Sequence, residues 1–244
     1  MKKILIPIIV VIIIVVLVAV FYKPTPKETI KIGAIVSLTG KYQDIGNQMM
    51  DGAILAQDEI NEKLGNKKIE IVFEDGQLDT KTALSAYQKL ANIDRINIFL
   101  VAHSNISKAV SEVAQKDKNI VMNIYAVSPG IPETGDYIFR NDIKAKDEAR
   151  ILVDFIKTNN YKRLALFNVS SDGAIAIADF IKNFLVGSGI EIVYDENYKL
   201  NETDFRTQLT KVKSARPDII LSISAPKQMG EIIKTAFELG LNAK

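Results

Sequence analysis

The chain lacks cysteine and tryptophan, and it has a single histidine, His103, among 244 residues. The lack of cysteine excludes disulfides, a cysteine nucleophile and a lipid-modified cysteine anchor. One histidine is too few for the usual metal cluster, and a helix-capping role in a loop is favoured over a catalytic or metal-binding one. No Gly-x-Gly-x-x-Gly motif or Walker loop follows an apolar strand, so the sequence predicts no enzyme, metal site or cofactor.

The chain also lacks a large excess of positive or of negative charge. The chain carries 31 Lys and Arg residues against 29 Asp and Glu residues. The N-terminal end holds Lys2, Lys3, Lys23, Lys27 and Glu28, and without them 27 basic residues face 28 acidic ones. The small basic excess therefore belongs to the N-terminal end. The rest of the chain has no excess of basic residues of the kind that binds nucleic acid.

One long apolar run is present, at residues 4–21 (ILIPIIVVIIIVVLVAVF). At the helical rise it covers about 27 Å, close to the thickness of a hydrocarbon core. We expect residues 1–22 to form an uncleaved single-pass anchor in the cell membrane, with a cleaved signal segment as the alternative. Residues 23–29 are then a linker to an extracytoplasmic domain.

Short β-rich runs alternate with amphipathic helices from residue 30 onward. In the first half, strands are expected at 30–36, 68–73, 96–101 and 119–123, with helices near 45–64, 80–94 and 105–117. This alternation predicts a doubly wound α/β lobe at 30–141, with a parallel sheet covered on both faces.

After a connection at about 128–145 the pattern starts again. Strands are expected at 163–168, 190–194 and 218–222, with helices near 145–158, 174–187, 203–214 and 227–239. They predict a second lobe at 142–244 and a ligand between the lobes, beyond the carboxyl ends of the strands. Since the alternation calls for another strand after Gly240, we expect the second lobe to be truncated in this chain.

Four motifs carry a family resemblance. They are SLTG at 37–40, FED at 73–75, YIFR at 137–140 and TDF at 203–205, the last followed by Gln208. In this order they resemble branched-chain (Leu/Ile/Val) amino-acid-binding proteins, which have the type I periplasmic-binding fold. The resemblance covers about residues 30–241. It implies a receptor that closes two lobes on a small solute and delivers it to an ABC permease.

The resemblance also implies ligand contacts in the first lobe. Ser104 matches a serine that holds the ligand carboxylate, and its place at a helix N-terminus suits an anion. Ser104 and Asn105 are alternatively simple N-caps of that helix. The loop Tyr125-Ala126-Val127 stands where the family often has Ser-Ala-Thr, so a hydroxyl is missing there. Tyr42 lies in the first strand-to-helix loop, where exposure without function is the alternative.

The second lobe departs further from the family pattern. Asp172 stands where the family often has a tyrosine, and Ala225 stands where relatives commonly have an aromatic residue. Gln228 replaces a glutamate that pairs with the ligand ammonium, and Asp172 is an alternative source of that negative charge. These departures leave room for another small polar or amide-like solute.

Two functions follow as expectations. The first is a solute-binding protein of an ABC importer, with an amino acid or similar solute as its ligand. The second is a receptor ectodomain of the same fold that senses a ligand and signals to a membrane partner. Genes for a permease and an ATPase beside this one favour import, whereas a kinase or regulator gene favours sensing.

Overall fold

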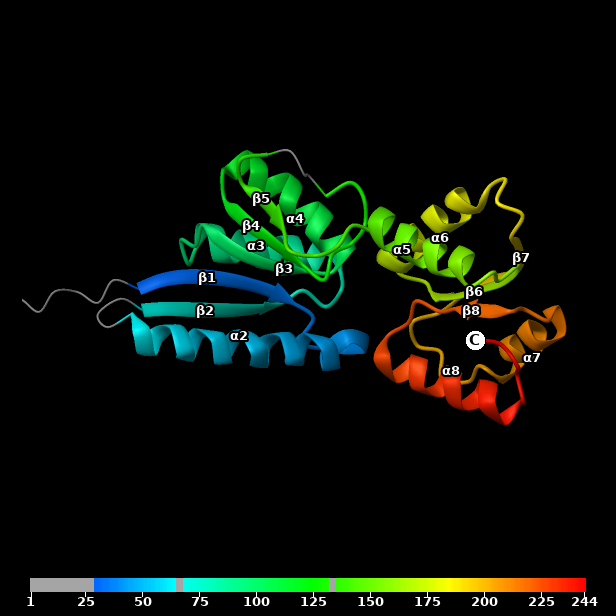
Figure 1. Ribbon diagram of the computed structural model, residues 1–244. Helices are drawn as coiled ribbons and strands as arrows, with labels where there is room; N and C mark the ends of the chain where they lie inside the picture. The colour runs from blue at the N-terminus through cyan, green and yellow to red at the C-terminus, as the bar shows by residue number, and fades with distance from the viewer. Residues whose placement is uncertain (1–28, 65–67, 132–134) are drawn as a thin grey trace, which may run out of the picture.

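The computed structural model describes residues 29–64, 68–131 and 135–244, which form two α/β lobes (Figure 1). The apolar run at 4–21, expected to be a membrane anchor, lies outside these residues. Among the helices that are described, none combines the length and apolar character needed to cross a membrane.

The first lobe contains a parallel sheet in the order β2-β1-β3-β4-β5. Its elements, in chain order, are β1 (Thr29–Val36), η1 (Gly40–Tyr42), α2 (Gln43–Lys63), β2 (Lys68–Asp75), α3 (Thr80–Asn92), β3 (Ile98–Ala102), α4 (Ser104–Asp117), β4 (Ile120–Ile124) and β5 (Ile138–Arg140). The predicted alternation of strands and helices is therefore present. The exception is β5, a three-residue strand inside the segment predicted as a connection.

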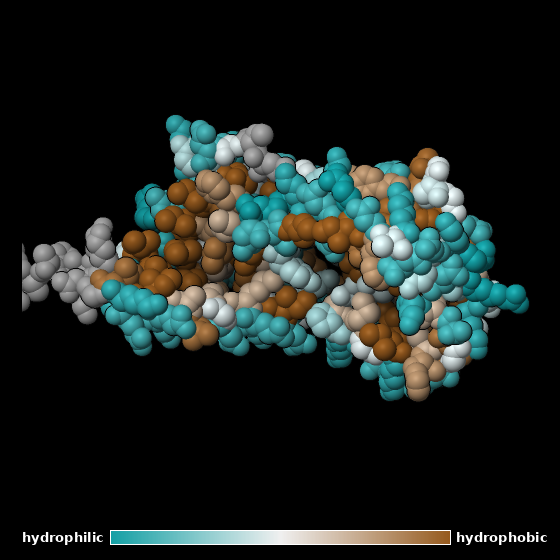
Figure 2. Space-filling view, in the orientation of Figure 1, coloured by the Kyte–Doolittle hydropathy of each residue, from teal (hydrophilic) through white to brown (hydrophobic). Residues whose placement is uncertain are grey.

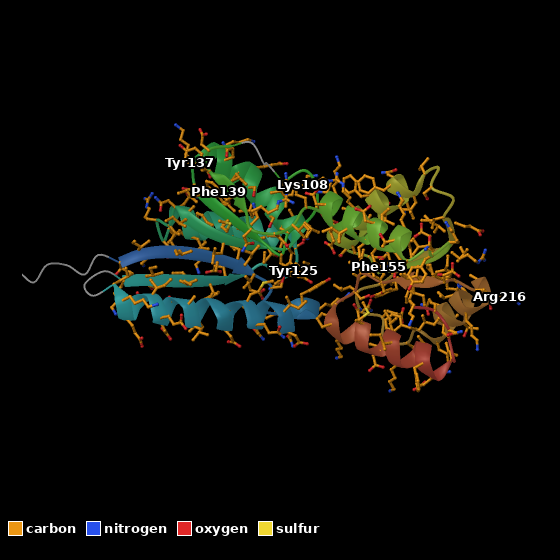
Figure 3. All side chains as sticks on the ribbon, in the orientation of Figure 1. Lys108, Tyr125, Tyr137, Phe139, Phe155 and Arg216 are labelled. Carbon is orange, nitrogen blue, oxygen red and sulfur yellow. The ribbon has the colours of Figure 1, made fainter. Side chains whose placement is uncertain are left out.

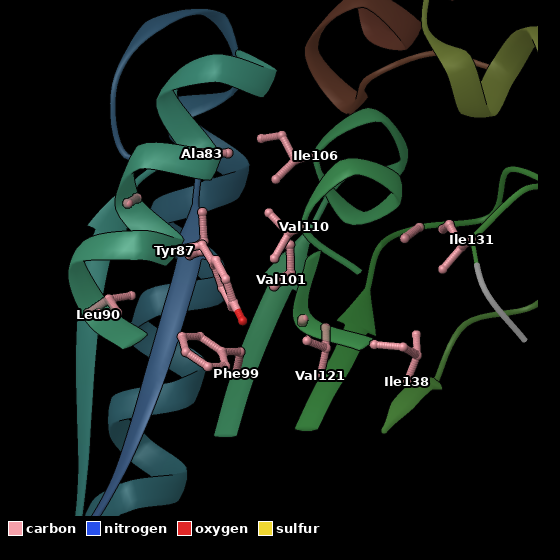
Figure 4. Close-up of a cluster of buried hydrophobic side chains, with 14 of the residues drawn as sticks. Ala83, Tyr87, Leu90, Phe99, Val101, Ile106, Val110, Val121, Ile131 and Ile138 are labelled. Carbon is pink, nitrogen blue, oxygen red and sulfur yellow. The ribbon is translucent and has the colours of Figure 1, made fainter. Parts of the chain in front are cut away.

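The core of the first lobe lies between the sheet and the pair α3 and α4 (Figure 4). Tyr87 of α3 packs against Phe99 of β3 with ring centroids 4.9 Å apart. The Tyr87 hydroxyl donates to Asp117 and accepts from Asn119, so its polar end is satisfied although the ring is buried.

The opposite face of this sheet fulfils only in part the prediction that both faces are covered. Ile98, Leu100 and Met122 point away from the core and stay partly exposed, and Phe139 is 47% exposed. Figure 2 shows apolar residues gathered on this lobe. Within the described residues, one face of the sheet is therefore only partly covered.

Helix α2 lies along β2, the edge strand of the sheet (Figure 1). The Asn61 side chain exchanges two hydrogen bonds with the backbone of Ile69, and Gln57 accepts one from the N–H of Ile71. These side chains pair backbone groups that an edge strand leaves open. The helix buries little apolar surface in return, since Leu55 is 62% exposed.

The second lobe contains a parallel sheet in the order β7-β6-β8. Its elements are α5 (Ala145–Thr158), β6 (Arg163–Val169), α6 (Asp172–Leu185), β7 (Glu191–Tyr198), α7 (Arg206–Ala215), β8 (Ile219–Leu221) and α8 (Pro226–Glu238). Helices α5 and α6 cover one face of this sheet, and α7 and α8 cover the other. Here the prediction of a sheet covered on both faces is confirmed.

Candidate ligand-binding cleft

A cavity of about 380 Å³ lies between the two lobes. Its walls come from the segments at or after the carboxyl ends of all eight described strands. These residues are Tyr42, Leu78, His103, Tyr125, Asp142, Val169, Leu200 and Ile223, given in the order of the strands. Open parallel sheets bind ligands at this edge, and here two such edges face one cavity.

The lobes approach each other closely beside the cavity. Gly173, at the start of α6, lies so near the first lobe that an added Cβ would be 3.0 Å from Val127 Cγ2 and 3.6 Å from Ser104 Oγ. A second cavity of about 370 Å³ adjoins this contact and shares Ser104 and Asp172 with the first. Lys108 lines the second cavity only.

Ser104 begins helix α4 and lines both cavities. Its hydroxyl oxygen accepts a hydrogen bond from the Ser128 N–H at 3.2 Å, which leaves the hydroxyl hydrogen available to a ligand. No acidic residue lies in the first turn of α4, and the side chain at its N-cap position makes no cap hydrogen bond. The helix N-terminus therefore keeps its partial positive charge and suits an anionic or carbonyl oxygen.

The N-cap alternatives for this loop are wrong. His103, predicted to cap this helix, occupies the N-cap position of α4 in place of Ser104 or Asn105, but its side chain makes no cap hydrogen bond. Asn105 instead donates from Nδ2 to the Leu78 carbonyl at 3.0 Å. That bond ties the loop after β2 to the loop after β3, and both loops line the cavity.

His103 lies between two tyrosines of the cavity wall. Its ring centroid is 5.0 Å from that of Tyr42 and 5.5 Å from that of Tyr125, both in edge geometry. Burial lowers the pKa of His103 to about 4, so the ring is neutral near pH 7. Its Nε2 atom is buried and has no hydrogen-bond partner among the described residues.

Both tyrosines have raised pKa values, so their hydroxyls stay protonated. Burial, with a smaller effect of Tyr125, raises the pKa of Tyr42 to about 12, and the Ser171 hydroxyl of the second lobe opposes this shift. Burial and then the charges of Asp142 and Glu148 raise the pKa of Tyr125. Tyr125 remains 48% exposed, and Figure 3 shows it where the two lobes face each other.

Three carboxylates line the cavity: Asp142, Glu148 and Asp172. Among the described residues that line it there is no lysine or arginine. Burial, followed by the negative charge of Asp142, raises the pKa of Glu148. Asp172 lies in the first turn of α6, where a carboxylate also stabilises the helix dipole.

Three serine hydroxyls contribute to the second-lobe wall. Ser170, Ser171 and Ser224 line the cavity. Ser224 accepts a hydrogen bond from the Tyr198 hydroxyl at 2.5 Å and lies 2.6 Å from the Ser222 hydroxyl. This network orients the Ser224 hydroxyl in the cavity wall.

Most of the predicted site residues meet in this cavity. Those that line it are Tyr42, Ser104, Asn105, Tyr125, Val127, Asp172 and Ala225. The side chains of the other two lie elsewhere. Ala126 is fully buried in the first-lobe core, and its N–H donates to Asp142. Gln228 donates from Nε2 to the Leu200 carbonyl at 2.7 Å.

Several residues that line the cavity were not predicted from the sequence. Asp142 and Glu148 follow β5, a strand too short to recognise, and Ser170, Ser171 and Ser224 follow β6 and β8. The rule that ligands bind beyond strand ends was the available signal for the serines, because both strands were predicted.

Comparisons with known proteins agree with this architecture. The family model described as periplasmic binding protein matches residues 29–244. The Leu/Ile/Val-binding protein BraC3 of Rhizobium johnstonii is 25% identical over 226 residues, which are 91% of this chain and 62% of that protein. A Pseudomonas aeruginosa protein described as binding leucine, isoleucine, valine, threonine and alanine is 24% identical, over 89% of this chain and 59% of its own length.

Solved structures share the fold. A branched-chain amino-acid transporter substrate-binding protein of Streptococcus pneumoniae, in complex with isoleucine, matches with a TM-score of 0.77 and 28% identity, over 88% of this chain and 63% of the other. A solute-binding protein of Rhodopseudomonas palustris, in complex with 3,4-dihydroxybenzoic acid, matches with a TM-score of 0.79 and 24% identity, over 88% and 61%. This chain spans about 60% of the length of such relatives. With its two parallel-sheet lobes and its match over residues 29–244, it belongs to the periplasmic binding protein family with the type I fold, and it is similar to the branched-chain amino-acid-binding proteins.

Proposed function

We propose that this chain is an extracytoplasmic solute-binding protein of an ABC importer, which captures an amino acid or a similar small polar solute between lobes at 30–141 and 142–244. The observation that carries the proposal is the cavity at the carboxyl ends of the strands of both lobes. A cavity shared by two lobes allows a ligand to stabilise a closed arrangement, because closure adds contacts that the open one lacks.

The polar groups around the cavity fit the two ends of an amino acid. The Ser104 hydroxyl and the uncapped N-terminus of α4 provide donors for a carboxylate. The carboxylates of Asp142, Glu148 and Asp172 provide partners for an ammonium group. Both ends need such partners, since a charge left unpaired in a closed cleft costs several kcal/mol.

The proposal extends to the membrane. We propose that residues 1–22 hold the receptor at the outer surface of the cell membrane, with residues 23–29 as the tether. Its partner there is an ABC permease, which receives the solute. A relative described as a transporter substrate-binding protein supports this role.

Thermal unfolding of the full chain in the presence of single solutes tests the function. The panel contains amino acids, amides, amines and aromatic acids, each at the same concentration. A solute present at about 100 times its Kd adds about 2.7 kcal/mol to the free energy of unfolding. For a chain of this size we expect the Tm to rise by about 5–10 °C. A panel in which no solute raises the Tm contradicts the proposal.

A further inference from the structure

We propose that the ligand of this cavity carries a net positive charge, and that Asp142 and Glu148 bind its cationic nitrogen while the His103 ring hydrogen-bonds a neighbouring polar group of the ligand. The ligand is then a basic amino acid or a small amine. This inference rests on the proposed function, since it names the ligand class of the same cavity.

The charge of the cavity wall is the first argument. Asp142, Glu148 and Asp172 line it, and no described lysine or arginine does. A zwitterionic solute adds no net charge to this wall. A solute with an additional cationic group adds a positive charge that the lining carboxylates attract.

The geometry of the acidic pair is the second argument. Asp142 is held in place by the N–H groups of Ala126 at 3.1 Å and Ile143 at 2.9 Å, one on each carboxylate oxygen. Glu148 lies in the first turn of α5 and is half-buried. Burial, followed by the negative charge of Asp142, raises the pKa of Glu148, which is the direction that repulsion between two carboxylates gives. A cationic nitrogen bound to both removes that repulsion.

His103 supplies an independent sign of a ligand. It is 4% exposed, it lines the cavity, and its buried Nε2 has no partner among the described residues. Buried polar atoms in folded proteins are normally hydrogen-bonded. Because the ring is neutral, it can accept or donate a hydrogen bond without adding positive charge to the site. A ligand group that hydrogen-bonds to Nε2 provides the partner that this buried atom lacks.

Tyr125 extends the site that binds the cationic group of the ligand. Its ring is half exposed toward the cavity, and the charges of Asp142 and Glu148 both act on it. An aromatic ring beside carboxylates attracts cations through its electron-rich face. The three side chains together therefore favour an ammonium or methylated ammonium group over a neutral one.

Calorimetric titration of the full chain with matched solutes tests the inference. Lysine and norleucine differ by one terminal amine, putrescine is a cation without a carboxylate, and benzoate is an anion. We expect lysine or putrescine to bind about tenfold tighter than norleucine and benzoate. If norleucine or benzoate binds as tightly as both cations, the inference is overturned while the proposed function stands. If no solute of any class binds, both fail.

Variants locate the cationic nitrogen. Glu148→Gln keeps the size of the side chain and removes its charge, and we expect it to weaken binding of the cationic solute by about tenfold. Asp147→Asn is the matched control, because Asp147 is the neighbouring residue, pairs with Arg150 and does not line the cavity. His103→Phe keeps an aromatic ring and removes Nε2, and it should weaken binding as well. Circular dichroism and the Tm verify that each variant folds. Unchanged affinity in folded Glu148→Gln contradicts the inference.

Discussion

At the residue scale, left-handed backbone positions the first-lobe side chains of the cavity. The φ angles are 55° at Leu78, 70° at His103 and 50° at Tyr125, and all three residues line the cavity. Such a conformation costs about 1–3 kcal/mol for a residue other than glycine. The rest of the folded lobe offsets this cost. Glycine would adopt the same backbone conformation at no such cost, but it has no side chain to place in the cavity wall.

The neutral His103 makes the stability of the chain sensitive to acid. Its pKa falls from the ordinary 6.5 to about 4 on folding, so between these values the unfolded chain binds a proton that the folded chain does not. The free energy of unfolding therefore decreases as the pH falls through this window, by about 3 kcal/mol in total. Urea denaturation of the full chain at pH 7 and pH 4 measures this loss.

His103→Phe provides the control for that titration. The variant keeps a ring between Tyr42 and Tyr125 but has no group that titrates there. We expect it to lose less stability than the parent between pH 7 and pH 4. An equal loss in both proteins assigns the acid sensitivity to carboxyl groups elsewhere.

Ser104 offers a direct test of one ligand contact. Ser104→Ala removes the hydroxyl at the start of α4, and we expect ligand binding to weaken by about 1–3 kcal/mol. Ser107→Ala is the matched control, since the Ser107 hydroxyl bonds the Val101 carbonyl in the core and does not line the cavity. Affinity that is unchanged in a folded Ser104→Ala protein removes this residue from the site.

Site residues were predictable where a recognised strand or motif fixed their position. Ser104 and Tyr125 follow strands with clear apolar runs, and both line the cavity. Ala126 comes next in the chain, but its side chain enters the first-lobe core. Gln228 is turned away by its bond to the Leu200 carbonyl, a contact between distant segments that local sequence does not reveal.

At the scale of elements, a close contact between α2 and the end of β1 fixes the first strand-to-helix connection. Gly46 lies in the first turns of α2, and a Cβ added there would be 1.8 Å from the carbonyl oxygen of Ser37. Since the obstacle is backbone, a side chain forces the helix and the strand end apart. The loop between them contains Tyr42, so this contact also positions the cavity wall.

Two glycines of α2 give a matched pair of substitutions. We expect Gly46→Ala to destabilise the chain by about 2–4 kcal/mol through this clash. Gly52→Ala meets nothing within 4 Å, and we expect it to stabilise by about 0.5–1 kcal/mol through helix propensity. Chemical denaturation of both variants measures the difference. Equal stabilities contradict the close packing of α2 on β1.

The strand and helix pattern was predictable because each long element has a clear apolar period. β5 was missed because three residues are too few for such a pattern, and its pairing with β4 is a long-range contact. The open face of the first sheet was missed for a related reason. Apolar strands predict burial, but they do not indicate whether the covering segment belongs to the described residues.

At the scale of the whole molecule, the two lobes form one site that neither forms alone. His103, Ser104 and Tyr125 come from the first lobe, and Ser171 and Asp172 come from the second. Gly173 brings the lobes together at one side of the cavity without filling it. A solute held by both sets of groups stabilises the closed arrangement of the two lobes.

The crystal structure of the full chain with the solute that raises its Tm most is the most direct test of this central claim. We predict one solute in the cavity, with contacts to Ser104 or His103 in the first lobe and to Ser171 or Asp172 in the second. A solute bound on an outer surface, or one that contacts only one lobe while the cavity stays empty, would contradict it.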